Sequence, residues 1–432
     1  MQIHHFGAVL AGLTCLTSVS IAQTRDHGLA RLGKVEFAVS CTPAALTKFH
    51  TAMSQLAAHH GEDMEAKILS ALFTSANFNP ADKAYTNQLT AARALEPLFK
   101  AHPNHPGVAH YLIHSYDYPP LAQHGLAAAR TYAAIAPDAS HALHMPSHIF
   151  TRVGYWKESI AANRESARVA LEVTPNGQHA TDYMVYAHLQ LAQDGAAAAA
   201  LRDALAKKPS DGFPAAFAYA TMPARLVLER GDWAAAAALT LNPTADAYPW
   251  KRYPQAEAIN AFARGVGAAR GGNAAAARTE QTRLTALRDA ARELKLGYWV
   301  EQIDIQAALL GALALCAEGK AEPCIEDLKA TATREDATEK HAVTPGPLIP
   351  ARELLAEMLL EQKKFAAALA EYEAVMKKEP NRYRTLAGAM AAAQGSGDAT
   401  KAKSFAVALM KLAGEADSQR ASLQQAKQLA GG

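Results

Sequence analysis

Two pairs of histidines with the same spacing are the residues of this chain best suited to chemistry. His110 and His114 lie four residues apart in HYLIHSYD, and His144 and His148 repeat that spacing in HMPSHIF. Residues four apart share one face of an α-helix, so each pair would present two imidazoles side by side. Each histidine of the first pair has its counterpart thirty-four residues later. The spacing therefore predicts one site to which two equivalent helices contribute.

Four such imidazoles are suited to bind a metal ion. Helices packed about 8–10 Å apart bring in-register pairs towards one place, and neutral imidazole is the commonest metal ligand in proteins. Asp117 would be a further ligand or would orient a ring. All-imidazole sites suit zinc, copper, iron or nickel, and zinc or copper is the expected ion. Two alternatives stay open: a metal-free polar groove, and histidines that are simply packed or solvated.

Four further residues are expected to line the same groove from nearby helices. His141 and Arg152 flank the second histidine pair, whereas His179 and Asp182 open the next predicted repeat in HATDYMVYAHLQ. A ligand bound near the histidines would meet these side chains.

A charged, breaker-rich stretch, REDATEKHAVTPGPLIPARELL from Arg334, supplies two more candidates, Lys340 and His341. Its prolines and glycine predict a long loop before a helix that begins near Ala351. The loop either folds back over the groove, which would offer both side chains to a ligand, or is an ordinary solvated linker.

Pro146 falls between the two histidines of the second pair. A proline inside a helix removes a backbone donor and crowds the carbonyl four residues earlier. Either the helix kinks there and re-aims His144, or it begins at Pro146 and leaves His144 in the preceding loop.

Common enzyme motifs do not account for these residues. In HYLIH and HMPSH, Tyr111 and Met145 occupy the position where a zinc protease of the HExxH type has its glutamate. The sequence contains no phosphate-binding loop, no G-x-S-x-G elbow and no C-x-x-C pair. Whether the protein is an enzyme stays open.

The composition of the chain indicates which kinds of partner are not expected. Half of the 432 residues are apolar, 19% are charged and the net charge is +2, which predicts a globular chain with no electrostatic footprint for nucleic acid. We expect no segment after the N-terminus to span a membrane.

The first 22 residues predict an exported protein. They contain a short apolar stretch that ends in the small-x-small pattern Ser20-Ile21-Ala22. This is typical of a signal peptide cut after Ala22, although a buried N-terminal helix is the alternative. Export would place the mature protein in the periplasm or outside the cell. There, Cys316 and Cys324 would form a local disulfide or remain two buried thiols.

From about residue 106 to 432 the chain alternates alanine-rich amphipathic stretches with similar turns, such as GYWKES, GDWAAAA and KKFAAA. This pattern predicts an all-α fold of repeated helix pairs, preceded by an irregular helical cap over residues 23–105. In most of these turns a helix stop is followed five residues later by a small residue: Ser159, Ala236, Ala277, Cys324, Ala368 or Ala402.

The repeat resembles the tetratricopeptide repeat (TPR), and HYLIHSYDYPP and HMPSHIF look like segments shared by a group of secreted bacterial TPR proteins. The resemblance implies a right-handed α-solenoid of antiparallel helix pairs whose first helices line a concave groove. A peptide, protein or small molecule would bind there. The leading hypothesis is an exported repeat protein that binds a ligand through a metal; the alternatives are a metal-dependent enzyme and a metal-free interaction scaffold.

Overall fold

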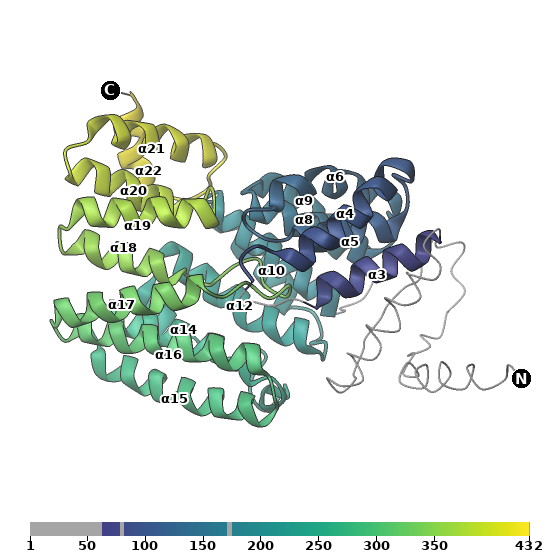
Figure 1. Ribbon diagram of the computed structural model, residues 1–432. Helices are drawn as coiled ribbons and strands as arrows, with labels where there is room; N and C mark the ends of the chain where they lie inside the picture. Colours follow the sequence, from purple (N-terminus) through teal and green to yellow (C-terminus); the bar gives the residue numbers. More distant parts are fainter. Residues whose placement is uncertain (1–62, 78–81, 171–174, 432) are drawn as a thin grey trace, which may run out of the picture.

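The computed structural model describes residues 63–77, 82–170 and 175–431. The predicted signal peptide and the first part of the predicted cap lie outside these residues. Throughout the described part the regular structure is helical (Figure 1). The all-α prediction is confirmed there.

The helices follow one another with short turns. The first half of the described chain contains α3 (Met64–Ala76), α4 (Thr86–Ala101), α5 (Pro106–Tyr116), η2 (Ala122–Gly125), α6 (Leu126–Ile135), α7 (Ser140–His144), α8 (Pro146–Arg152), α9 (Trp156–Val169), α10 (Pro175–Gln190), α11 (Asp194–Leu205) and α12 (Phe213–Arg230). The second half contains α13 (Trp233–Ala237), η3 (Trp250–Arg252), α14 (Pro254–Arg270), α15 (Ala274–Glu293), α16 (Gly297–Ala317), α17 (Ala321–Asp336), α18 (Ala351–Glu361), α19 (Phe365–Lys378), α20 (Tyr383–Gly395), α21 (Ala399–Leu412) and α22 (Ala421–Gly431).

The predicted turns share one backbone conformation. A residue with positive φ precedes each second helix by two positions, and at five turns it is a glycine: Gly154, Gly231, Gly272, Gly319 and Gly397. Glycine adopts this left-handed conformation without steric cost. In DGAAAAA the left-handed residue is Ala192, two positions before α11, and Gly195 lies inside that helix.

The small residue five positions later is fully buried at every turn where the sequence predicts one: Ser159, Ala236, Ala277, Cys324, Ala368 and Ala402 are at most 1% exposed. A small side chain at this position allows close contact between the two helices of a pair. Cys324 is also bonded to Cys316, so of the two alternatives for these cysteines the structure has the disulfide.

Helices pack on their neighbours in sequence and on the next helix but one, as α10 does on α12 and α14 on α16. The C-terminal helices also return to the middle of the chain. Trp156 Nε1 donates to the Asn381 carbonyl at 2.8 Å, and the Gly195 amide donates to Asp417 at 2.9 Å. A strictly linear stack would make contacts only between adjacent units, so this chain departs from that limit.

One helix contradicts an expectation from composition. The 21 residues of α16 are long and apolar enough to cross a membrane, contrary to the prediction that no later segment would be. In the fold, α16 packs against α14, α15 and α17, and its Leu309, Leu310 and Leu313 are at most 1% exposed. These contacts make it a core helix of the bundle.

Pro146 divides one predicted helix into two. Helix α7 ends at His144, Met145 keeps a helical backbone conformation, and α8 begins at Pro146. The structure matches each alternative in part: α8 begins at Pro146, but His144 lies at the end of a separate helix, α7, and not in a loop.

Candidate metal centre

Three neighbouring helical segments bring six histidines together. Helix α5 carries His110 and His114, the α7–α8 segment carries His141, His144 and His148, and α10 carries His179. Helix α5 contacts α8, and α7 contacts α10, so the segments lie in the order of the chain. The predicted meeting of equivalent helices therefore occurs, with a third helix added.

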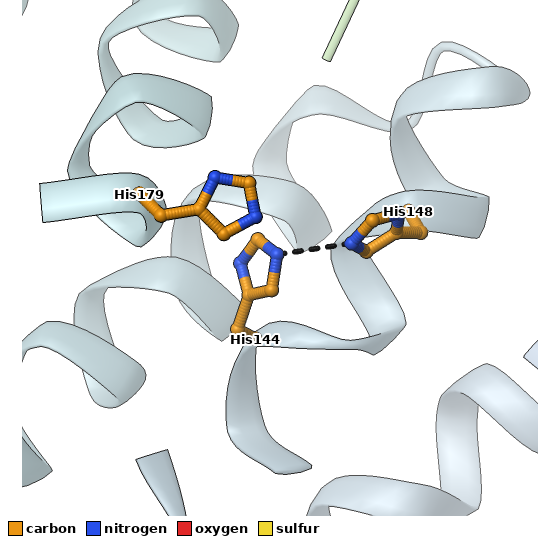
Figure 2. Close-up of side chains that lie close together, drawn as sticks. All are labelled: His144, His148 and His179. Atoms are coloured by element: carbon orange, nitrogen blue, oxygen red, sulfur yellow. Dashed lines mark hydrogen bonds between the residues drawn. The ribbon is translucent and has the colours of Figure 1, made fainter. Parts of the chain in front are cut away.

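His144, His148 and His179 form the tightest group, which we call the histidine triad (Figure 2). One ring nitrogen from each lies within 4.8 Å of the other two, and the group could hold a metal ion. The Nε2 atoms of His144 and His148 are 3.0 Å apart. The rings of His144 and His179 have centroids 4.4 Å apart. His144 and His148 are each only 2% exposed.

Asn163 on α9 fixes the protonation of His144. The Asn163 amide nitrogen donates to the Ser159 carbonyl at 2.7 Å, which turns the amide oxygen towards His144 Nδ1 at 2.6 Å. An amide oxygen only accepts hydrogen bonds, so Nδ1 must carry the proton. In the neutral ring, His144 Nε2 then has a free lone pair.

Asp117 does the same for His148. Its Oδ2 lies 2.9 Å from His148 Nδ1, and a carboxylate can only accept, so Nδ1 is again the donor. Arg152 Nε donates to Oδ1 and Lys340 Nζ to Oδ2, each at 2.8 Å. Both carboxylate oxygens are thus occupied, and Asp117 orients a ring instead of pointing at the triad as a ligand.

These two hydrogen bonds leave an unfavourable contact at the centre of the triad. His144 and His148, when neutral, present two Nε2 lone pairs to each other at 3.0 Å. A shared proton would require a buried imidazolium. Burial, with the neighbouring imidazoles, holds the pKa of His144 well below its ordinary value. Burial also lowers the pKa of His148, although Asp117 opposes this. A metal cation satisfies both lone pairs at once.

His110, His114 and His141 form a second group beside the triad. His110 Nε2 lies 3.1 Å from His114 Nε2 and 3.3 Å from His141 Nε2. The ring of His114 faces that of His148 with centroids 6.1 Å apart. The four histidines predicted as one set of ligands are therefore divided: His144 and His148 belong to the triad, and His110 and His114 to its neighbour.

The segment over residues 337–350, which joins α17 to α18, extends towards α10 (Figure 1). Tyr183, beside the triad, donates to the carbonyls of Ala342 and Thr344 at 3.1 and 2.9 Å. The Lys340 side chain is 4% exposed, and burial lowers its pKa to about 8 although Asp117 opposes this. Of the two alternatives for this loop, the structure has the one that folds back.

Two predicted groove residues lie apart from the triad. Asp182 turns away and pairs with the buried Arg225, whose Nε donates to it at 3.1 Å. The ring of His341 packs against Tyr298 and Trp299, with centroids 5.6 and 5.2 Å away.

The sequence analysis missed two residues of the centre, Asn163 and Tyr183. Tyr183 packs against all three triad rings, with centroids 4.8–5.2 Å away. It follows His148 by thirty-five residues, as His179 follows His144. This recurrence of the i, i+4 spacing on a third helix was the signal that could have identified Tyr183. Asn163 had none, because nothing in its helix distinguishes it from an exposed polar residue.

A cavity of about 80 Å³ lies close to the centre, beneath the 337–350 segment. Its wall includes Trp299, Gln255 and Gln302, together with Arg152 and Lys340. The last two also hold Asp117, so the cavity and the triad share supporting residues.

No protein-family model matches this chain, and a search of curated proteins also finds no match. The argument about function therefore depends on the geometry of the centre.

Proposed function

We propose that this protein is an exported helical-repeat protein that takes up a transition-metal ion, zinc or copper, at His144, His148 and His179, and binds a ligand through that ion. The fold would be TPR-like, a right-handed superhelix of antiparallel helix pairs whose first helices line the groove. The repeated turns and their buried small residues support this architecture.

The observation that carries the proposal is the pair of Nε2 atoms 3.0 Å apart, each with its Nδ1 already committed to an acceptor. Histidine ligands commonly donate their second N–H to a carboxylate or a carbonyl, which fixes the tautomer and makes the free nitrogen a better ligand. Asp117 and Asn163 supply both kinds of acceptor. A buried polar contact without a proton to share otherwise costs free energy.

The distances fit a transition metal. Metal–nitrogen bonds of about 2.0–2.1 Å in tetrahedral geometry place ligand nitrogens roughly 3.3 Å apart. His144 and His148 are close to this separation, and His179 has a ring nitrogen within 4.8 Å of theirs. Three protein nitrogens leave one coordination position for an external ligand.

Two observations support the remaining parts of the proposal. The Cys316–Cys324 disulfide is typical of an oxidising compartment and so favours export. Among the described residues, the large hydrophobic side chains that are exposed are Leu294 and Val407 alone. A polar peptide or small molecule therefore suits this surface better than an apolar helix.

Elemental analysis of untagged, mature protein tests the proposal, followed by zinc titration of the metal-free protein. We expect zinc or copper in the purified protein, and loss of one equivalent in the double variant His144→Gln/His148→Gln with its circular dichroism unchanged. Wild-type protein that takes up no ion at micromolar concentrations of either metal would leave only the metal-free interaction scaffold.

A metal-dependent enzyme is the second candidate, favoured by the open coordination position. A three-histidine site with one free position is also the arrangement of catalytic zinc, where a bound water supplies the acid or base. Asp117 is fully engaged in orienting His148, so it is not available as a proton carrier. Turnover of activated ester substrates by the zinc-loaded protein, abolished in the same double variant, would favour this candidate.

A further inference from the structure

Three helices that pack side by side line the cavity beneath the 337–350 segment with polar and aromatic side chains. Helix α12 supplies Phe217, α14 supplies Gln255, and α16 supplies Trp299, Gln302 and Gln306. On α16, Gln302 follows Trp299 by three positions and precedes Gln306 by four, so all three side chains share one helix face. The inner faces of these helices therefore bring three glutamines to one small space.

Polar atoms without a partner gather around this cavity. Four of its wall residues have a buried side-chain atom that lacks a hydrogen-bond partner: Gln255 Oε1, Gln302 Nε2, Gln306 Oε1 and Glu339 Oε2. Such an atom has lost its hydrogen bonds to water without replacing them within the protein. The two ends of an amide exchange places by a flip, so each glutamine can offer either a donor or an acceptor to a molecule in the cavity.

The size and the aromatic part of the wall limit what the cavity can hold. Its volume is about 80 Å³. A single water needs about 10–15 Å³, so the cavity takes roughly five waters or one small molecule. The rings of Phe217 and Trp299 lie 5.5 Å apart in the wall. Pockets for small molecules combine such an apolar surface with a few polar groups. The wall therefore suits a small carbon skeleton that carries several polar groups.

The charges of the wall nearly balance. It contains four cationic side chains and three carboxylates: Arg152, Arg225, Lys340, Lys378, Glu335, Glu339 and Glu379. Each cation has a carboxylate partner that does not line the cavity. Arg152 and Lys340 donate to Asp117. Arg225 donates to Asp182, and Lys378 Nζ lies 3.6 Å from Asp336. Neither sign of ligand charge is favoured by such a wall.

We propose that this cavity binds a small uncharged molecule rich in hydroxyl groups, a polyol or a monosaccharide, held by Gln255, Gln302 and Gln306. A hydroxyl group both donates and accepts hydrogen bonds, which matches amides that offer both. The carbon skeleton packs against Phe217 and Trp299. The site goes beyond the proposed metal function, since none of the triad histidines lines the cavity.

Isothermal titration calorimetry of the full-length, untagged protein with glycerol, D-ribose and D-glucose tests this. D-Glucosamine and D-gluconate are the cationic and anionic counterparts of glucose. The variant Gln302→Leu/Gln306→Leu removes two of the three amides, and Gln424→Leu, at an exposed glutamine on α22, is the matched control. Titrations with chelator present and in His144→Gln/His148→Gln separate this site from the metal centre.

We expect saturable binding of at least one of the three uncharged compounds. Loss of two hydrogen bonds should weaken it about tenfold or more in Gln302→Leu/Gln306→Leu, with no change in the control. Chelator and the histidine variant should also leave it unchanged, so a failure of the metal proposal would not affect this result. The inference is overturned if none of the three compounds binds, which means that the cavity holds water alone. Binding of glucosamine or gluconate without glucose, or binding that chelator abolishes, would also overturn it.

Stability without ligand gives a second readout. Replacing a buried polar group that has no partner by an apolar one of similar size is close to neutral or stabilising. We therefore expect Gln302→Leu/Gln306→Leu to unfold at the same or a higher temperature than wild type. If the double variant does not fold, the single variant Gln255→Leu on α14 decides, with the same expected loss of binding. Lower stability in both variants would show that the amides serve the fold, and wild-type binding in a folded Gln255→Leu protein would count against the site.

Discussion

Two buried polar clusters in this molecule look alike in burial and differ in how they are neutralised. The first is the histidine triad with Asp117 and Asn163. The second, which we call the ion cluster, lies between α10, α12, α18 and α20 and contains Tyr186, Glu229, Glu353, Glu357, Arg382, Thr385 and Arg384.

In the ion cluster each guanidinium meets a carboxylate. Arg382 is fully buried and donates to both oxygens of Glu353 at 3.1 Å, to Glu229 at 2.9 Å and to the Tyr186 hydroxyl at 2.6 Å. Arg384 donates to Glu353 and Glu357. Opposite charges in this geometry compensate for the loss of water, although one buried oxygen of Glu229 and one of Glu357 have no hydrogen-bond partner.

In the triad, by contrast, the acceptors Asp117 and Asn163 occupy the outer nitrogens and leave inner lone pairs opposed. Burial alone therefore does not distinguish a structural cluster from a binding site. The distinction is whether the groups that face each other within the chain are complementary in charge. By that criterion the ion cluster serves the fold, and the triad needs a cation from outside.

The largest effect should follow from breaking the ion cluster. Arg382→Met leaves Glu229 buried without its ion-pair partner and leaves Glu353 with Arg384 and Thr385 alone, and removal of one member of a buried pair costs about 3–5 kcal/mol. Urea unfolding followed by circular dichroism measures the loss. The control is Arg168→Met, which removes the exposed pair with Glu165 and should change stability by less than about 1 kcal/mol. Equal small effects in both variants would mean that the cluster is not structural.

Next in size is the effect of metal on stability. An ion that binds only the folded state adds about 2.7 kcal/mol at a free concentration of 100 times Kd. We expect zinc to raise the unfolding temperature of wild-type protein and chelator to reverse it, with little change in His144→Gln/His148→Gln. Zinc should also stabilise Arg382→Met as much as wild type, because the two clusters are independent. If zinc raised the unfolding temperature of His144→Gln/His148→Gln as much as that of wild type, the stabilising ion would not bind at the triad, and the contrast with the ion cluster would be wrong.

A smaller effect is expected from removing one orienting group. Asn163→Leu leaves His144 without the acceptor that fixes its tautomer, and loss of such a partner typically weakens metal binding 10–100-fold. Competition titration with a zinc indicator measures the change. Asn260→Leu is the control, since Asn260 is a buried asparagine on α14 and should leave zinc affinity unchanged. Wild-type affinity in Asn163→Leu would show that the Nδ1 contact does not prepare His144 as a ligand.

The smallest effect concerns the 337–350 segment. In Lys340→Met, Asp117 keeps Arg152 and His148 as partners, so zinc affinity should fall by less than about tenfold. The same titration compares it with Asp117→Asn, which weakens the acceptor of His148 itself and should have the larger effect. If Lys340→Met lost as much affinity as Asp117→Asn, the segment would have to be considered part of the binding machinery.

Much of the centre could be predicted from spacing within single helices. The i, i+4 pairs placed His110 beside His114 and His144 near His148, and the thirty-four-residue interval placed the two segments in register. His179 was expected to line the groove from the next repeat and is a member of the triad. Helical periodicity fixes which residues share a face, and repetition fixes which faces are equivalent.

What could not be predicted is how faces from different helices meet. Asp182 sits three residues after His179 and was expected in the same groove, yet it pairs with Arg225. His341 was expected near the histidines and packs against Tyr298 and Trp299 instead. A few tens of degrees of rotation about a helix axis decide such outcomes, and packing against neighbouring helices sets that rotation.

The sequence by itself determined the helices, their turns and the recurrence of histidines on successive helical segments, because these depend on local conformation and on short periodic spacings. Only the tertiary structure decided that the six histidines divide into two groups and that Asp117 orients a ring. It also decided that Lys340, 223 residues further along the chain, reaches that carboxylate. The physical reason is that contacts between distant segments are set by the packing of the whole chain, which no local pattern encodes.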